Sequence, residues 1–469
     1  MHCITNNFNK IKRTDMKKTL FTVALGLLLS SCLLGPNFGG ATAELPETWI
    51  NHMPPSTTQH DLTTWWAAFG DSQLNQLIES AFANNPDMVN AALSIARAEA
   101  ELRSTWSGIL PSGSVGLGGT NAGDFRDSNS HGRWNGSLSL SWKPDVWGGT
   151  RRQIEASMAS LGSTVAAANA TRTAMASSVA TAYFEWISAK ESLRIAKEQL
   201  EFQERTFNIV SKRKEAGMAS ELDVEQARST ILSTRAQIPG HEATIKTCEN
   251  ALAILLGTTV NNVRLSMPSA STYNKIPRVP TGLPSELLRR RPDIIRAEYD
   301  LHRAVANVGV AVANLFPSVS LSGSTSSSAG SDFAHFFSTA GWSLVGNVSQ
   351  TIFNRTALNE AVNVAEIAAS SAGQSYRKTV LAAFAEVEEC LILYARLTNQ
   401  LPQYEASVQA NKKAAELSMR RYEAGESDFL NVASAERAWL SSELNVISTR
   451  QQIRMALARL CTALGGGWK

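Results

Sequence analysis

The sequence predicts a mainly helical protein with an internally duplicated chain and with strands long enough to form a membrane β-barrel. Three observations lead to this prediction. Motifs recur in the two halves of the chain at an offset of 206 to 208 residues. Each half contains segments in which apolar and polar residues alternate, which is the pattern of a strand. Each half also contains a helical pattern much longer than about 25 residues, which is typical of coiled coils and helical repeats.

The duplication is carried by pairs of motifs: Asn-Pro-Asp at 85–87 and Arg-Pro-Asp at 291–293, Glu-Ala-Gly at 215–217 and again at 423–425, and Leu-Asp-Val at 222–224 and Leu-Asn-Val at 430–432. The repeats of solenoid proteins are much shorter, at about 20 to 50 residues. We therefore expect two equivalent halves, a first repeat over residues 61–270 and a second repeat over residues 271–469.

The N-terminus has the pattern of a targeting segment. A basic start at Met16 is followed by a short apolar stretch and then by small residues before Cys32. The apolar stretch is too short to stay in a membrane, so residues 1–31 are expected to be a signal peptide with Met16 as the initiator. A cysteine after small residues resembles the lipobox of bacterial lipoproteins, which implies that Cys32 is acylated. The alternative is an ordinary signal peptide with an incidental cysteine.

Residues 32–60 are rich in Pro, Thr, Asn and Gly and lack periodicity, so we expect a lipidated tether there. Helical patterns then begin near Thr63 and near Asp87, and Pro111 ends the second of them. The polar and apolar alternation that follows predicts two strands in each repeat, near residues 113–121 and 134–143 and near residues 318–326 and 341–350.

The length and composition of these strands indicate a membrane. A membrane-spanning strand needs about 9 to 11 residues. Trp134, Leu138 and Trp142 alternate with serine and asparagine, which is the pattern of an outer-membrane strand with an apolar outer face and a polar inner face. The alternative is a pair of ordinary hairpins in a soluble sheet.

Very long helices follow the strands in both repeats. Residues 150–216 and residues 356–424 read as helices, and the first would be about 100 Å long at 1.5 Å per residue. Gly217 and Gly425 break the pattern, so each repeat is expected to form a helical hairpin with a turn near 217 or near 425. Pro239-Gly240 and Pro402 are expected to be kinks or irregularities.

The strand count predicts a trimer. Four strands cannot close a barrel, and open edges are not tolerated in lipid. Eight strands would close a barrel that is only wide enough for its own side chains. We therefore expect three chains, which would form a 12-stranded membrane barrel continued by a long α-helical barrel; the resemblance described next implies that these lie in the outer membrane and the periplasm.

Several stretches resemble the outer-membrane efflux proteins, the TolC-like channels: residues 32–38, 65–74, 145–148, 282–293 and 422–432. The most specific is Arg290-Arg291-Pro292-Asp293, which is similar to the signature of the second repeat in that family. The stretch that starts at Cys32 resembles the lipoprotein, NodT-type branch of resistance-nodulation-division efflux systems.

The resemblance implies the outer-membrane channel of a tripartite efflux system, a passive duct that exports small molecules and catalyses nothing. The implied partners are two further copies of the chain, a periplasmic adaptor (membrane fusion) protein, an inner-membrane efflux pump and outer-membrane lipid. The implied location is the outer membrane, with a lipid anchor and a periplasmic helical extension. Two alternatives remain open: a type I protein secretion duct, and a lipid-anchored coiled-coil tether without a pore.

In many relatives, acidic rings narrow the periplasmic mouth. The matching second-repeat positions hold Asn431 and Ser434, so we expect Asp223, helped by Glu225, to carry the charge of the constriction. The alternative is that these acids only stabilise the first turn of a helix.

The hairpin tips are the expected docking points for the adaptor, at Gly217, Met218, Gly425 and Glu426.

Other function classes find no support in the sequence. The net charge of +3 gives no nucleic-acid footprint. No HExxH, GxSxG or P-loop motif occurs, so no catalytic residue, cofactor or metal site is expected. Cys248, Cys390 and Cys461 have no paired spacing and are expected to be buried. The identity of the exported substrate is not encoded in any motif.

Overall fold

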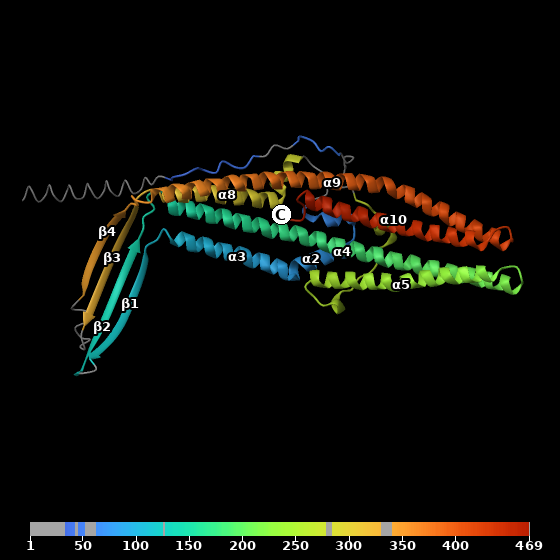
Figure 1. The fold of residues 1–469 in the computed structure, drawn as a ribbon, viewed down its shortest axis with the longest axis horizontal. Helices are drawn as coiled ribbons and strands as arrows, with labels where there is room; N and C mark the ends of the chain where they lie inside the picture. The colour runs from blue at the N-terminus through green and yellow to red at the C-terminus, as the bar shows by residue number, and fades with distance from the viewer. Residues whose placement is uncertain are drawn as a thin grey trace, which may run out of the picture. The chain divides into compact units, whose positions relative to one another are not determined.

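A computed structural model describes residues 33–42, 46–51, 62–124, 127–277, 284–329 and 340–468 (Figure 1). Cys32, the expected signal peptide and part of the expected tether lie outside the described residues. The described chain forms two units. The first comprises described residues before 43, residues 95–164 and described residues of 296–377. The second comprises the described residues of 43–94, 165–295 and 378–469. Each unit is considered by itself below.

The elements of the first repeat are the 3-10 helix η1 (Leu62–Phe69), α2 (Ser72–Asn84), α3 (Pro86–Ser107), β1 (Ser112–Asp124), β2 (Asp127–Trp142), α4 (Gly149–Glu215) and α5 (Glu221–Leu255). The link contains η2 (Val260–Asn262) and α6 (Ala270–Asn274). The second repeat contains η3 (Pro284–Glu286), α7 (Leu287–Arg290), α8 (Pro292–Ala313), β3 (Ser318–Ala329), β4 (Gly341–Ser349), α9 (Arg355–Glu423) and α10 (Phe429–Ala463). The order helix, two strands, long helix, return helix therefore occurs twice.

Three details refine the expectations. The first helical pattern consists of the 3-10 helix η1 followed by the α-helix α2. Strand β2 begins at Asp127 and not near residue 134, because its polar first residues also pair with β1. Pro239 and Pro402 lie inside α5 and α9, which continue through both positions as the helical patterns predicted.

The first unit contains a four-stranded antiparallel sheet in the order β1-β2-β3-β4. Its register places residues of like character opposite one another: Val115 faces Leu138, and Ser114 faces Ser139. Residues that are paired across strands share a face, so one face is apolar and the other is lined by serine, glycine and asparagine. Serine hydroxyls bond across that polar face, as between Ser114 and Ser139 at 2.7 Å.

The apolar face of this sheet is strongly exposed in the single chain. Leu117 is 81% exposed and Trp342 is 83% exposed. Contiguous exposed apolar surface on a monomer marks contact with protein or membrane. Among the helices in the described parts of the chain, none is both long enough and apolar enough to cross a membrane.

The second unit is held at one point by a buried aromatic group. The rings of Trp65 and Phe69 in η1 pack edge-on with their centres 6.2 Å apart, and the ring centres of Phe69 and Phe184 of α4 are 5.0 Å apart. The hydroxyl of Tyr183 donates to the Asp71 carboxylate at 2.9 Å, and the same carboxylate caps α2. Burial and the nearby charge of Asp71 raise the pKa of Tyr183, so this phenol remains a donor.

Candidate functional site: the paired hairpin turns

The two hairpin turns of the second unit have the same backbone geometry. Gly217 and Gly425 adopt φ values of 71° and 79°, in the left-handed region that favours glycine. In each turn the glycine N–H and the next N–H bond back to the end of the preceding helix, as in Met218 N to Arg213 O at 2.8 Å and Glu426 N to Arg421 O at 2.9 Å. Both are Schellman motifs, so the turn of the first repeat is reproduced in the second.

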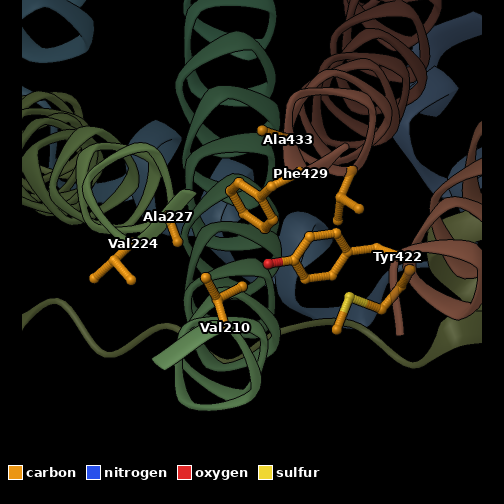
Figure 2. Packing of buried hydrophobic residues seen from close by; sticks show 8 residues of the cluster. Val210, Val224, Ala227, Tyr422, Phe429 and Ala433 are labelled. Carbon is orange, nitrogen blue, oxygen red and sulfur yellow. The ribbon is translucent and has the colours of Figure 1, made fainter. Parts of the chain in front are cut away.

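The two turns pack against each other through one apolar cluster (Figure 2). Its buried members come from all four helices: Val210, Val224, Ala227, Met419, Tyr422, Phe429, Val432 and Ala433. Arg213 ties the turns further, because it donates to the carbonyl of Glu423 and its guanidinium lies 5.1 Å from the centre of the Tyr422 ring. The tips therefore form one packed body.

The helix starts after the two turns are different. In α5, Ser220 and Asp223 form a capping box: Ser220 N donates to the Asp223 carboxylate at 3.0 Å, and Asp223 N donates to Ser220 Oγ at 3.2 Å. In α10 the equivalent N-cap, Asp428, makes no side-chain cap. Asn431 instead bonds to Ser427 Oγ at 3.0 Å.

Asp223 therefore stabilises the first turn of α5, which was the alternative to a constriction charge. This capping role does not conflict with a role in a constriction. Glu225 is exposed and pairs with Arg228 at 2.9 Å. Ser434 is also exposed. The structure thus places Asp223 and Asn431 at equivalent positions of the two hairpins, with Glu225 two residues after Asp223 and Ser434 three residues after Asn431.

The tips also present exposed apolar side chains. Met218, Leu222 and Leu430 are 62%, 65% and 55% exposed, and Glu426 is charged and exposed. Apolar side chains surrounded by polar ones are typical of a protein-contact surface.

A buried carboxyl in the hairpins was not expected from the sequence. Glu436 of α10 is 1% exposed, and its only described partner is the hydroxyl of Thr206 on α4 at 3.2 Å. Gln199 and Gln203 are also buried on α4, each with one side-chain polar atom that has no described partner. Burial raises the pKa of Glu436 to about 7. Its partner Thr206 is 230 residues away along the chain, so only the three-dimensional pairing of α4 with α10 reveals the burial.

The signature residues Arg290, Arg291, Pro292 and Asp293 have structural partners. Arg291 binds Asp293 at 2.7 Å, Glu386 of α9 at 2.8 Å and the carbonyl of Ala463 at 2.9 Å. Burial would lower the pKa of Arg291, but the bonds to Asp293 and Glu386 outweigh it and raise the pKa. Pro292 begins α8, where a missing N–H costs nothing. The motif therefore joins the start of α8 to the middle of α9 and the end of α10.

The described residues contain no cluster of His, Cys, Asp and Glu that could hold a metal ion. Cys248, Cys390 and Cys461 are buried thiols, and burial raises the pKa of Cys390 to about 11. Such thiols are protonated and inert at neutral pH.

Comparison with known families identifies the family to which this architecture belongs. The family model for outer membrane efflux proteins matches the chain twice, over residues 77–258 and 283–466. The chain belongs to this outer membrane efflux protein family. The double match confirms the predicted duplication, and membership confirms an outer-membrane efflux channel and excludes the enzyme class.

Individual relatives are similar over nearly their full length. The antibiotic efflux pump outer membrane protein ArpC of Pseudomonas putida is 30% identical, with 97% of this chain and 96% of the relative covered. The probable outer membrane lipoprotein SilC of Salmonella typhimurium is 29% identical, covering 96% and 99%. The open-state MtrE outer membrane channel of Neisseria gonorrhoeae has a TM-score of 0.82 at 26% identity, covering 93% and 99%.

The duplicated hairpins allow a paired test of the capping box. Ser220→Ala removes the acceptor for Asp223 N and should destabilise the start of α5 by about 1 kcal/mol. Asp428→Ala changes the equivalent N-cap, which makes no side-chain cap, and should cost less. Hydrogen exchange of the first-turn amides of α5 and α10 measures both effects. Equal acceleration in the two variants would contradict the assignment.

Glu436 predicts a pH dependence of hairpin stability. Its pKa is raised from 4.5 to about 7 by burial, so the folded state holds the proton more tightly than the unfolded chain. The stabilisation is complete below about pH 4.5 and is lost as the pH rises to about 7, by on the order of 3 kcal/mol. Glu436→Gln should remove this loss in denaturant unfolding at pH 5 and pH 8. Glu426→Gln, at an exposed position, is the control. If the free energy of unfolding of Glu436→Gln still falls between pH 5 and pH 8 as it does in the wild type, the prediction is refuted.

Proposed function

We propose that three copies of this chain form a passive duct that carries small molecules out through the outer membrane. The observation that carries this proposal is the two-faced sheet of the first unit, which has one exposed apolar face and one serine-lined face. Lipid outside and water inside is the environment that suits these two faces. A lining of serine, glycine and asparagine would favour no single substrate. This suits a passive duct, in which the pump and not the channel selects the substrate.

The trimer follows from the edges of the sheet. Strands β1 and β4 each pair with a single neighbour in the described chain. In lipid, their free N–H and C=O groups need partners. Three four-stranded sheets would close a 12-stranded barrel, and α4, α5, α9 and α10 of three chains would continue it as a helical barrel in the periplasm.

The partners in this proposal are a periplasmic adaptor (membrane fusion) protein and an inner-membrane pump. The exposed tip residues Met218, Leu222 and Leu430 support a docking surface for the adaptor near Gly217 and Gly425. The similarity to an antibiotic efflux pump component favours small molecules over secreted proteins. A tether without a pore does not fit membership in a family of efflux proteins.

Cys32 is the proposed acylation site. The lipobox-like sequence and the similarity to a probable outer membrane lipoprotein support this assignment. The acyl chain would add about 0.8 kcal/mol of membrane affinity for each buried methylene group.

The native mass of the detergent-extracted protein tests the trimer, and the mass of its N-terminal peptide tests the acylation. We expect three chains per particle and a lipid-modified Cys32. A monomer or dimer would leave four or eight strands, which are too few for an open conduit, and would overturn the duct.

Charge substitutions at the equivalent tip positions test the constriction. Asp223→Asn removes a negative charge from each chain but keeps an acceptor for Ser220 N, so helix α5 should persist while cation selectivity falls. Asn431→Asp adds a negative charge at the equivalent position and should raise the cation selectivity. Reversal potentials of single channels in a salt gradient measure both. If neither variant shifts the reversal potential, Asp223 has only the capping role.

A further inference from the structure

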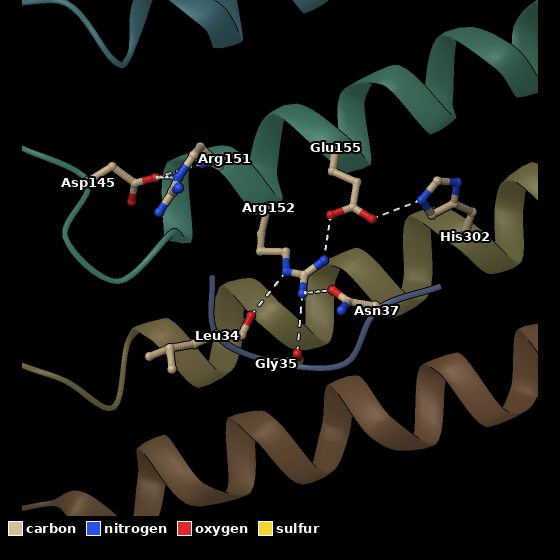
Figure 3. A network of polar contacts seen from close by, with 8 residues as sticks. All are labelled: Leu34, Gly35, Asn37, Asp145, Arg151, Arg152, Glu155 and His302. Atoms are coloured by element: carbon tan, nitrogen blue, oxygen red, sulfur yellow. Dashed lines mark hydrogen bonds and ion pairs between the residues drawn. The ribbon is translucent and has the colours of Figure 1, made fainter. Parts of the chain in front are cut away.

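A buried arginine of the first unit holds the chain segment that follows Cys32 (Figure 3). Arg152 of α4 is 1% exposed. Its Nε donates to the Leu34 carbonyl at 3.0 Å, and its Nη2 donates to the Gly35 carbonyl at 3.2 Å and to Asn37 Oδ1 at 2.6 Å. Its Nη1 donates to Glu155 at 2.6 Å. All three guanidinium nitrogens are therefore used, as a buried charge requires.

Two glycines make the close approach possible. Gly35 has a φ of +87°, and a Cβ on it would lie 2.4 Å from the Cα of Gly309 on α8. A Cβ on Gly309 would lie 2.8 Å from the side chain of Arg152. Any side chain at either position would separate the segment, α8 and the guanidinium.

Further contacts hold the two ends of the segment. Phe38 stacks on His302 of α8 with ring centres 4.5 Å apart, and His302 Nε2 lies 2.9 Å from Glu155. Burial would raise the pKa of Glu155, but the hydrogen bonds from His302 and Arg152 outweigh it and lower the pKa. The carboxylate is thus charged at neutral pH and neutralises part of the Arg152 charge. At the other end, Leu34 N donates to the Trp147 carbonyl at 3.3 Å.

Trp147 lies where β2 passes into α4. Its indole stacks on Phe316 with ring centres 5.0 Å apart, and its Nε1 donates to the Pro317 carbonyl at 2.7 Å, just before β3. The segment is therefore fixed beside the strand–helix junctions of both repeats.

We propose that Arg152 is a positioning residue that locks residues 34–38, the anchor latch, onto α4 and α8 and so holds the lipid-bearing Cys32 beside the strand–helix junctions. Two residues of chain span at most about 7 Å, so an acyl group on Cys32 would enter the membrane next to these junctions. A free tether over residues 32–60 would instead allow a reach on the order of 30 Å. The latch thus places the lipid anchor, and with it the membrane surface, at the ends of the strands.

The test uses the full-length protein in lipid vesicles, with nitroxide labels on pairs of introduced cysteines. Gly39→Cys with Asn307→Cys reports the latch against α8, and exposed Met158→Cys with Asn307→Cys reports the packing of α4 against α8. Arg152→Gln should abolish the narrow distance peak of the first pair and leave that of the second. Arg151→Gln, which changes the neighbouring arginine paired with Asp145, should leave both peaks narrow.

Two results would overturn the latch: a narrow first peak that survives Arg152→Gln, or the loss of both peaks together, which would show that Arg152 supports the helices and not the segment. Ni(II) chelated on lipid headgroups should relax the residue 39 label strongly in the otherwise unchanged protein, and no enhancement would refute the membrane position. The inference rests on the proposed acylation of Cys32, but the two fail separately. An unmodified N-terminal peptide with a narrow first peak would refute the acylation and leave the latch intact.

Discussion

Backbone hydrogen bonding at the edges of the sheet constrains everything else in the proposed duct. Each N–H or C=O left unpaired in hydrocarbon costs several kcal/mol, and β1 and β4 each present one such row in the single chain. Placing the sheet in water instead would be unfavourable, because Leu117 and Trp342 on its apolar face are more than 80% exposed in the single chain. A sheet of this kind is stable only when other copies cover its edges and lipid covers its outer face. The trimer and the membrane location both follow from that requirement.

The duplication preserves backbone geometry more strictly than side-chain chemistry. Both hairpin turns end their first helix with a glycine at positive φ and the same pair of return hydrogen bonds. The helix that follows is capped by Ser220 and Asp223 in one repeat, whereas Asp428 and Asn431 do not form that box in the other. The turn has little freedom, since only glycine adopts its φ without strain. A cap of this kind is exposed and worth about 1 kcal/mol, so the two helix starts can diverge, with Asp223 in one repeat and Asn431 at the equivalent position of the other.

Local patterns explain which features were predictable from the sequence. The alternation around Leu138, the breaks at Gly217 and Gly425 and the repeated motifs are all properties of short stretches, so the elements and the duplicated order could be derived from them. The segment after Cys32 was expected to be a tether because its composition lacks periodicity, yet residues 34–38 are docked. Its stabilising contacts come from Arg152, more than 100 positions away along the chain. A buried carboxyl at Glu436 was missed for the same reason, since its partner Thr206 lies in the other repeat.

The position of Glu436 suggests why a buried carboxyl is retained in the hairpins. Along α4, the polar residues Gln199, Gln203 and Thr206 separate the apolar cluster at Val210 from a second one around Ile195, which includes Leu440 and Ile447 of α10. Two long helices joined only by apolar contacts could slide by a turn at little cost, because one aliphatic layer packs much like the next. A polar layer removes that freedom, since displacement would leave the Glu436 carboxyl without the Thr206 hydroxyl in an apolar environment. We therefore interpret this layer as the element that fixes the register of α4 against α10, at a cost in stability that grows as Glu436 ionises.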